Sequence, residues 1–97
     1  MVFSIFAARR PELPARLTRD QIRDRLYQAL ADCKDMNAQR VIYKINVAPT
    51  PADLWLLRCD LHQCIARVHN QGEATRRIND LLDAFEGWVP SGHLTPI

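Results

Sequence analysis

Apolar residues recur at helical spacing over most of the chain between residues 18 and 87. The first such stretch follows Thr18, which forms with Gln21 the pattern of a capping box, where two side chains satisfy backbone amides at a helix start. Its apolar residues, three or four apart as on one face of a helix, are Ile22, Leu26, Ala29 and Cys33. We predict a helix that begins after Thr18 and ends near residue 34 or 35.

Residues 37–48, NAQRVIYKINVA, fit two patterns. The alternation typical of a strand is Val41, Tyr43, Ile45 and Val47. The helical stripe is Ala38, Val41, Ile42, Ile45 and Ala48. The β-branched content favours a strand, but its only partner would be residues 1–7, and a two-stranded sheet is marginally stable. We predict a helix and keep an α+β fold, with strands at 1–7 and 40–47, as the alternative.

A third helix is predicted to start at Pro51. Thr50 as the cap, Pro51 at the first helical position and Asp53 in the first turn form a typical helix start. The buried stripe of this helix is Leu54, Leu57, Leu61, Cys64, Ile65 and Val68. Because the stop signal Asn-Gln-Gly follows at 70–72, the helix should run to about His69.

A last helix is predicted at 73–86, ending at Gly87, since glycine commonly follows the last turn of a helix. Its apolar residues are Ala74, Ile78, Leu81, Leu82 and Phe85. The remaining residues, 88–97, contain two prolines and a glycine and are expected to be extended.

These elements predict one all-α domain, a small bundle of about four helices with an extended C-terminal tail. Its parts are an N-terminal extended segment at 1–17, a helical core at 18–87 and the tail at 88–97, and 97 residues suffice for one hydrophobic core. No stretch reaches the roughly 20 apolar residues that cross a bilayer. Three cysteines, an odd number, and the absence of a secretory charge pattern favour reduced thiols. We expect a cytoplasmic protein without membrane contact.

Two cysteines and two histidines crowd the stretch RCDLHQCIARVH at 58–69, which raises the hypothesis of a metal site. On a helix, Cys59 and Cys64 point about 140° apart, and His62 and His69 lie about 10 Å apart along the axis. Only Cys59 and His62 are then placed to share a zinc ion, and a structural zinc site needs two more ligands. Metal binding is therefore the remotest of three functional hypotheses.

Motifs of catalysis and cofactor binding are not found in the sequence. The three glycines form no phosphate-binding loop, and the two serines, Ser4 and Ser91, lie outside any nucleophile motif. We predict that the protein is not an enzyme and has no catalytic residue, no cofactor and no metal ion.

Apolar residues in excess of the core indicate a partner. Trp55 and Leu56 fall outside the buried stripe of the third predicted helix, and Tyr43 and Val47 are the excess of the preceding segment. A helix that is apolar on two sides is either central in its bundle or contacts another chain, and Trp and Tyr commonly anchor interfaces. We predict a small regulator or adaptor that binds another protein, or itself as a homodimer, through these four residues.

Arginines support the alternative function, which is binding of nucleic acid. Eleven of the 13 basic residues are arginine, and residues 1–40 hold eight basic and five acidic residues. The candidate phosphate-binding residues are Arg9, Arg10, Arg16, Arg19, Arg23, Arg76 and Arg77. Acidic residues interleave with them three or four positions away, which favours salt-bridged exposed faces instead, and a net charge of +2 is low for a DNA-binding domain.

Overall fold

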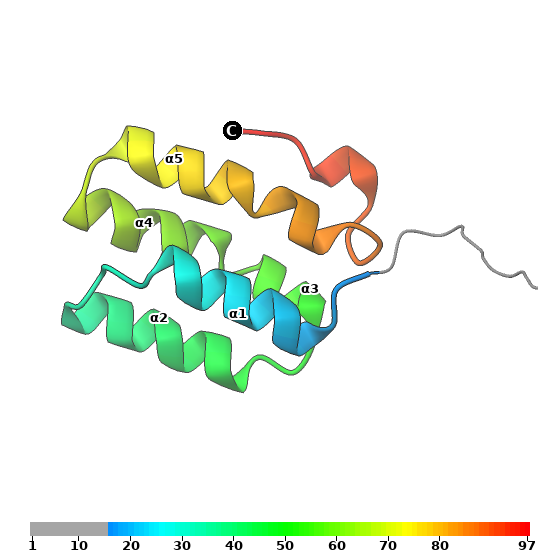
Figure 1. Cartoon of the computed structure of the whole chain (residues 1–97), viewed down its shortest axis with the longest axis horizontal. Coiled ribbons are helices and arrows are strands. Elements are labelled where there is room, and N and C mark those ends of the chain that lie inside the picture. The colour runs from blue at the N-terminus through cyan, green and yellow to red at the C-terminus, as the bar shows by residue number, and fades with distance from the viewer. Residues whose placement is uncertain (1–15) are drawn as a thin grey trace, which may run out of the picture.

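Side-chain caps start four of the five α-helices in residues 16–97, the part of the chain that this computed structural model describes (Figure 1). The capping residues are Thr18, Asp35, Thr50 and Asn70, and each accepts a hydrogen bond from the amide three residues later. Such a cap satisfies an amide that has no partner inside the helix, which fixes where the helix begins. The helices are α1 (Arg19–Ala29), α2 (Met36–Val47), α3 (Pro51–Trp55), α4 (Arg58–Val68) and α5 (Gln71–Asp80).

The predicted all-α fold is confirmed. Residues 40–47 belong to α2, and no strand or sheet forms within 16–97, where the only β-type contact is an isolated bridge between Glu86 and Val89. The α+β alternative is therefore wrong for 40–47, and its other strand, at 1–7, lies outside the described residues. None of the described helices is long and apolar enough to span a bilayer.

Helix α1 begins at the predicted capping box but ends at Ala29, several residues before the predicted end near residue 34 or 35. The Thr18 hydroxyl accepts from the Gln21 amide at 3.1 Å, and the Gln21 side chain accepts from the Thr18 amide at 2.9 Å. After Ala29 the amides bond three residues back, as that of Cys33 does to the carbonyl of Leu30 at 2.9 Å. These tight turns direct both side chains into the core, where each is 1% exposed.

The single helix predicted at 51–69 is wrong, because it divides into α3 and α4 at residues 56 and 57. The Leu57 amide bonds the carbonyl of Leu54, three residues back, at 3.1 Å. The side chain of Arg58 donates to the carbonyl of Trp55 at 2.9 Å, taking up an acceptor that a continuous helix would present to a backbone amide. The direction of the chain therefore changes between the two helices.

The helix predicted at 73–86 is also divided. Because Asn70 caps it, α5 begins at Gln71, and it ends at Asp80. A 3₁₀ turn, Leu82–Phe85, follows and buries its last two side chains. Gly87 then adopts a φ of +85°, a left-handed conformation that suits glycine after a helical segment.

The helices surround one core with α2 at its edge (Figure 1). Helices α4 and α5 pack as a hairpin, α1 packs against α2 and α3, and α2 also contacts α4. In Figure 1, α2 lies at the bottom of the bundle and α5 at the top. The largest fully buried side chains are Ile22, Leu26, Leu30, Ile45, Leu54, Leu61, Ile65 and Phe85. One side of α2 therefore has no other described helix beyond it.

The tail after Gly87 contains a short 3₁₀ turn at Ser91–His93 and is tied to the bundle at two points. The indole of Trp88 donates to the carbonyl of Leu17 at 2.7 Å. The amide of Ile97 donates to the side chain of Asn79 on α5 at 2.9 Å. The tail thus follows the bundle instead of projecting from it.

Candidate partner-binding surface

The four residues that the sequence proposes for partner binding divide into two groups. Tyr43, Val47 and Leu56 are exposed, with 66%, 53% and 71% of their surface accessible. Trp55 is only 8% accessible and belongs to the core. Partner binding requires Tyr43, Val47 and Leu56 to be exposed, as they are. That they contact a partner stays a prediction.

The inference that Trp55 lies on an outer face is wrong. Its ring meets that of Phe85 edge to face, with the centroids 5.0 Å apart and the planes at 67°. The guanidinium of Arg58 lies over its other side, 3.6 Å from the ring centroid, and separates it from solvent. The prediction fails because it placed Trp55 and the residues of α4 on one straight helix, whereas the break after Trp55 changes its direction relative to α4.

Helix α2 carries an apolar stripe on the side away from the core. Met36, Tyr43 and Val47 lie, together with Arg40, within about 60° of one another at about 100° per residue. The core face of α2, which contains Val41, is on the opposite side. Met36 is 70% exposed. We call Met36, Arg40, Tyr43 and Val47 the outer face of α2.

Sequence reasoning missed Met36, although a signal for it was present. The spacing 36, 40, 43, 47 alternates between four and three residues, as on a helix face that packs against another helix. Asp35, which precedes Met36, is the helix cap. Because the predicted helix was placed at 37–48, Met36 was left outside it.

Three described arginines near the front of the chain are held by backbone, carboxylate and aromatic groups. The guanidinium carbon of Arg16 lies 4.0 Å from the centroid of the Trp88 ring. Arg19 donates to the carbonyl of Pro49 at 3.1 Å. Arg23 donates to the carboxylate of Asp20 at 3.2 Å and to the carbonyl of Ala48 at 3.4 Å. These three arginines therefore join the start of α1 to neighbouring parts of the fold.

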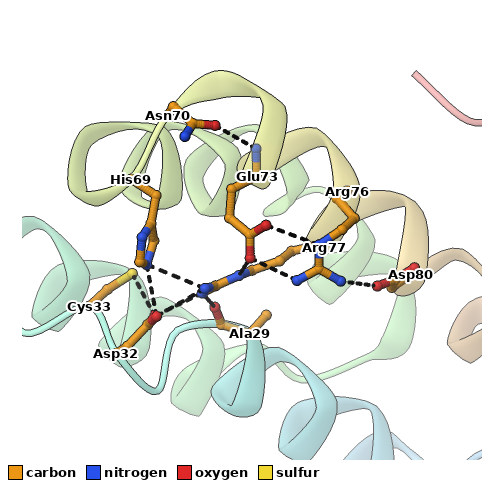
Figure 2. A network of polar contacts seen from close by, with 9 residues as sticks. All are labelled: Ala29, Asp32, Cys33, His69, Asn70, Glu73, Arg76, Arg77 and Asp80. Atoms are coloured by element: carbon orange, nitrogen blue, oxygen red, sulfur yellow. Dashed lines mark hydrogen bonds and ion pairs between the residues drawn. The ribbon is translucent and has the colours of Figure 1, made fainter.

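Arg77 is the centre of a polar network that joins α5 to the turn after α1 (Figure 2). Its guanidinium donates two hydrogen bonds to the carboxylate of Asp32, at 2.7 and 2.9 Å, and one to the carbonyl of Ala29 at 3.0 Å. Its Nε donates to Glu73 at 2.6 Å. The ring of His69 lies against the same carboxylate, with its Nε2 2.7 Å from Asp32. The network holds together segments that are 45 residues apart in the sequence.

These contacts shift the acidity of the carboxyl groups in the network. Hydrogen bonds from Arg77, and then from His69, hold the pKa of Asp32 well below its usual range, and these outweigh partial desolvation. Hydrogen bonds from Arg76 and Arg77 lower the pKa of Glu73 to about 2. Arg76 is also bonded to Asp80 at 2.8 Å.

The arginines that the sequence suggested for nucleic-acid binding are not free to bind phosphate together. Arg76 and Arg77 both form ion pairs with carboxylates of the fold. Arg9 and Arg10 lie outside the described residues. Among the described residues, no two of the arginines proposed for nucleic-acid binding therefore lie side by side without contacts to other groups of the fold.

The cysteines and histidines at 58–69 point to different parts of the fold. Cys64 is buried and Cys59 is exposed, while His62 meets the Thr75 hydroxyl at 3.2 Å. Burial raises the pKa of the Cys64 thiol, and that of Cys33 rises to about 11, also chiefly through burial. Within residues 16–97, no group of three or more metal-ligating side chains is close enough to hold an ion.

Comparison of the chain with protein-family models, with curated proteins and with solved structures finds no match.

Proposed function

We propose that the protein is a small non-enzymatic regulator or adaptor of the cytoplasm that acts by binding another protein through the outer face of α2. The observation that carries this proposal is the exposure of Met36, Tyr43 and Val47, each more than half accessible, in one row on an edge helix. Scattered single apolar residues are ordinary on protein surfaces. A row of three on one helix face is typical of a surface that another element covers.

Burial of this face would supply part of the free energy of binding. Burying a large apolar side chain completely contributes about 1.5–3 kcal/mol. Three side chains that are between half and three-quarters exposed would together contribute about 3–6 kcal/mol. Because association itself costs about 4–15 kcal/mol, a stable complex needs further contacts beside this row. Tyr43 adds a phenol hydroxyl that can form a hydrogen bond at the rim, a common role of tyrosine in interfaces. Leu56, at the end of α3, is a further exposed apolar residue for the same kind of contact.

The experiment that tests the proposal is site-specific photocrosslinking of the full chain in its native host. The photoreactive residue p-benzoylphenylalanine would replace Tyr43 or Val47 and, as the control, Gln28, which is exposed on α1. We expect both α2 positions to crosslink to the same protein and the control position to leave that protein unlabelled. Failure of both α2 positions to crosslink to any protein, or equal labelling from Gln28, would refute the proposal.

Binding of nucleic acid has less support, because Arg19, Arg23, Arg76 and Arg77 already bond to carboxylates or backbone carbonyls of the fold. Binding to phosphate would require these contacts to be exchanged. The test is titration of a labelled DNA duplex at increasing salt, where phosphate contacts produce a steep loss of affinity.

A further inference from the structure

Two of the nine arginines in residues 16–97 differ from the rest. Seven are engaged within the fold by ion pairs, by carbonyl oxygens or by a tryptophan ring, and these are Arg16, Arg19, Arg23, Arg25, Arg58, Arg76 and Arg77. Arg40 and Arg67 are both exposed, and neither forms an ion pair or side-chain hydrogen bond with another described residue.

Arg40 and Arg67 lie at one place, a shallow groove between α2 and α4. The groove is also lined by Lys44, Asp60 and Gln63. Lys44 on α2 bonds to Asp60 on α4 at 3.1 Å, so the one carboxylate in the groove is already neutralised. Three cations against one anion give this groove an excess of two positive charges.

The groove adjoins the exposed apolar stripe. Arg40 belongs to both, because it lies on the outer face of α2 between Met36 and Tyr43 and also lines the groove. The apolar row thus has along one side two guanidinium groups that form no ion pair within residues 16–97, and a partner must match both features. The partner must supply apolar side chains to the row and carboxylates to the edge, since arginine pairs carboxylates with two parallel hydrogen bonds.

We propose that the occupant of this surface is an amphipathic helix of another protein, with an apolar face and acidic residues along one edge. This inference rests on the proposed function and specifies its partner. A helix fits because Met36, Arg40, Tyr43 and Val47 span about three turns in a straight row, the form in which helices present side chains to one another.

A second copy of the chain is a poorer occupant. Pairing two α2 helices through this surface would bring two Arg40 side chains, and two grooves with an excess of positive charge, towards each other. Like charges in contact cost free energy and select against such pairs. A nucleic acid would satisfy the two arginines but would leave the apolar row without a partner.

The test uses the full chain and two synthetic helical peptides labelled with fluorescein. Both peptides carry the same leucine row at alternating spacings of three and four, flanked by glutamates in one and by lysines in the other. Fluorescence anisotropy would measure their affinities at low and physiological salt. We expect the acidic peptide to bind about tenfold or more tightly than the basic one, and the difference to shrink as salt screens it.

Reversing the charge of both arginines in the groove tests whether they select the acidic peptide. Arg40→Glu combined with Arg67→Glu should reverse the preference, so that the basic peptide binds more tightly. The matched control combines Lys34→Glu, Gln28→Glu and Gln71→Glu, which changes the net charge equally, lies outside the groove and should keep the original preference. Because all the substituted side chains are exposed, circular dichroism should show unchanged helix content in both variants.

The other outcomes overturn the inference in distinguishable ways. Equal binding of both peptides would keep the apolar contact of the proposed function and refute the acidic partner. Crosslinks from Tyr43 to a second copy, with a doubled mass by light scattering, would show that the surface binds another copy of the chain and not an acidic helix. Crosslinks to the chain's own residues 1–15 would show that this segment covers the surface. Tight binding of a DNA duplex that Arg40→Glu and Arg67→Glu abolish would assign the surface to nucleic acid. Binding of neither peptide would refute the inference.

Discussion

Trp55 and Leu56 are adjacent in the sequence, yet the structure places one in the core and the other in solvent. Trp55→Ala and Leu56→Ala are therefore a matched pair of substitutions whose effects on stability should differ widely. A tryptophan buries about 150–250 Å², which at about 25 cal/mol per Å² corresponds to about 4–6 kcal/mol as an upper bound. With 8% exposure and an edge-to-face contact with Phe85, Trp55→Ala should lower the free energy of unfolding by about 4 kcal/mol.

Leu56→Ala should cost less than about 0.5 kcal/mol, because the side chain is 71% exposed and leaves no cavity. Urea unfolding followed by circular dichroism measures both. We expect the Trp55→Ala midpoint to fall by more than about 1 M urea and the Leu56→Ala midpoint to remain close to that of the parent chain.

Domains of this size are stable by about 5–15 kcal/mol, so the loss expected for Trp55→Ala is a large part of the total stability. Trp55→Phe keeps an aromatic ring and should be intermediate. In a Trp88→Phe chain, the emission of Trp55 alone should be blue-shifted and resist quenching by acrylamide. Equal stability loss at positions 55 and 56, or easy quenching of Trp55, would refute its assignment to the core.

Three further predictions concern acidity, thiol reactivity and backbone conformation. The pKa of Glu73 is lowered in the folded chain to about 2, so its ion pairs stabilise the fold fully above its ordinary pKa and are lost as pH falls from about 5 towards 2. The urea midpoint of Arg77→Gln should therefore depend less on pH in this window than that of the parent chain. An equal pH dependence of the two midpoints would contradict the network. In the native chain iodoacetamide should modify only Cys59, the one exposed cysteine, and rapid modification of all three by mass spectrometry would contradict their burial. Gly87→Ala should destabilise by about 1 kcal/mol or more, because φ is +85° and its added methyl group would overlap a neighbouring side chain; Gly92→Ala, where that space is open, is the control in the same urea assay.

The outer face of α2 was partly readable from the sequence. Tyr43 and Val47 stood out because they exceed what one core stripe requires. Met36 belonged to the same row, but recognising it required Asp35 to be identified as the cap and the helix to begin at Met36. The sequence could not show that Arg40 and Arg67 have no ion-pair partner among residues 16–97, since this depends on what the other arginines bind.

The starts of α1 and α3 are what the sequence by itself determined most securely. Thr18 with Gln21, and Thr50 with Pro51, act within one turn of the chain, so a few neighbouring residues suffice to fix them. The helical form of α2 also followed from the sequence, because a strand there had no partner able to make a stable sheet. The all-α class follows from these local signals and from the three-and-four spacing of apolar residues.

The ends and faces of the helices were decided only by the tertiary structure. The ring of Trp55 packs against that of Phe85, which is distant in the sequence, and this contact places Trp55 in the core instead of on the expected outer face. Arg77 reaches Asp32 across 45 residues, a pairing that no local pattern encodes. A local hydrogen bond is fixed by spacing along the chain, whereas burial and charge pairing depend on how distant segments meet in space.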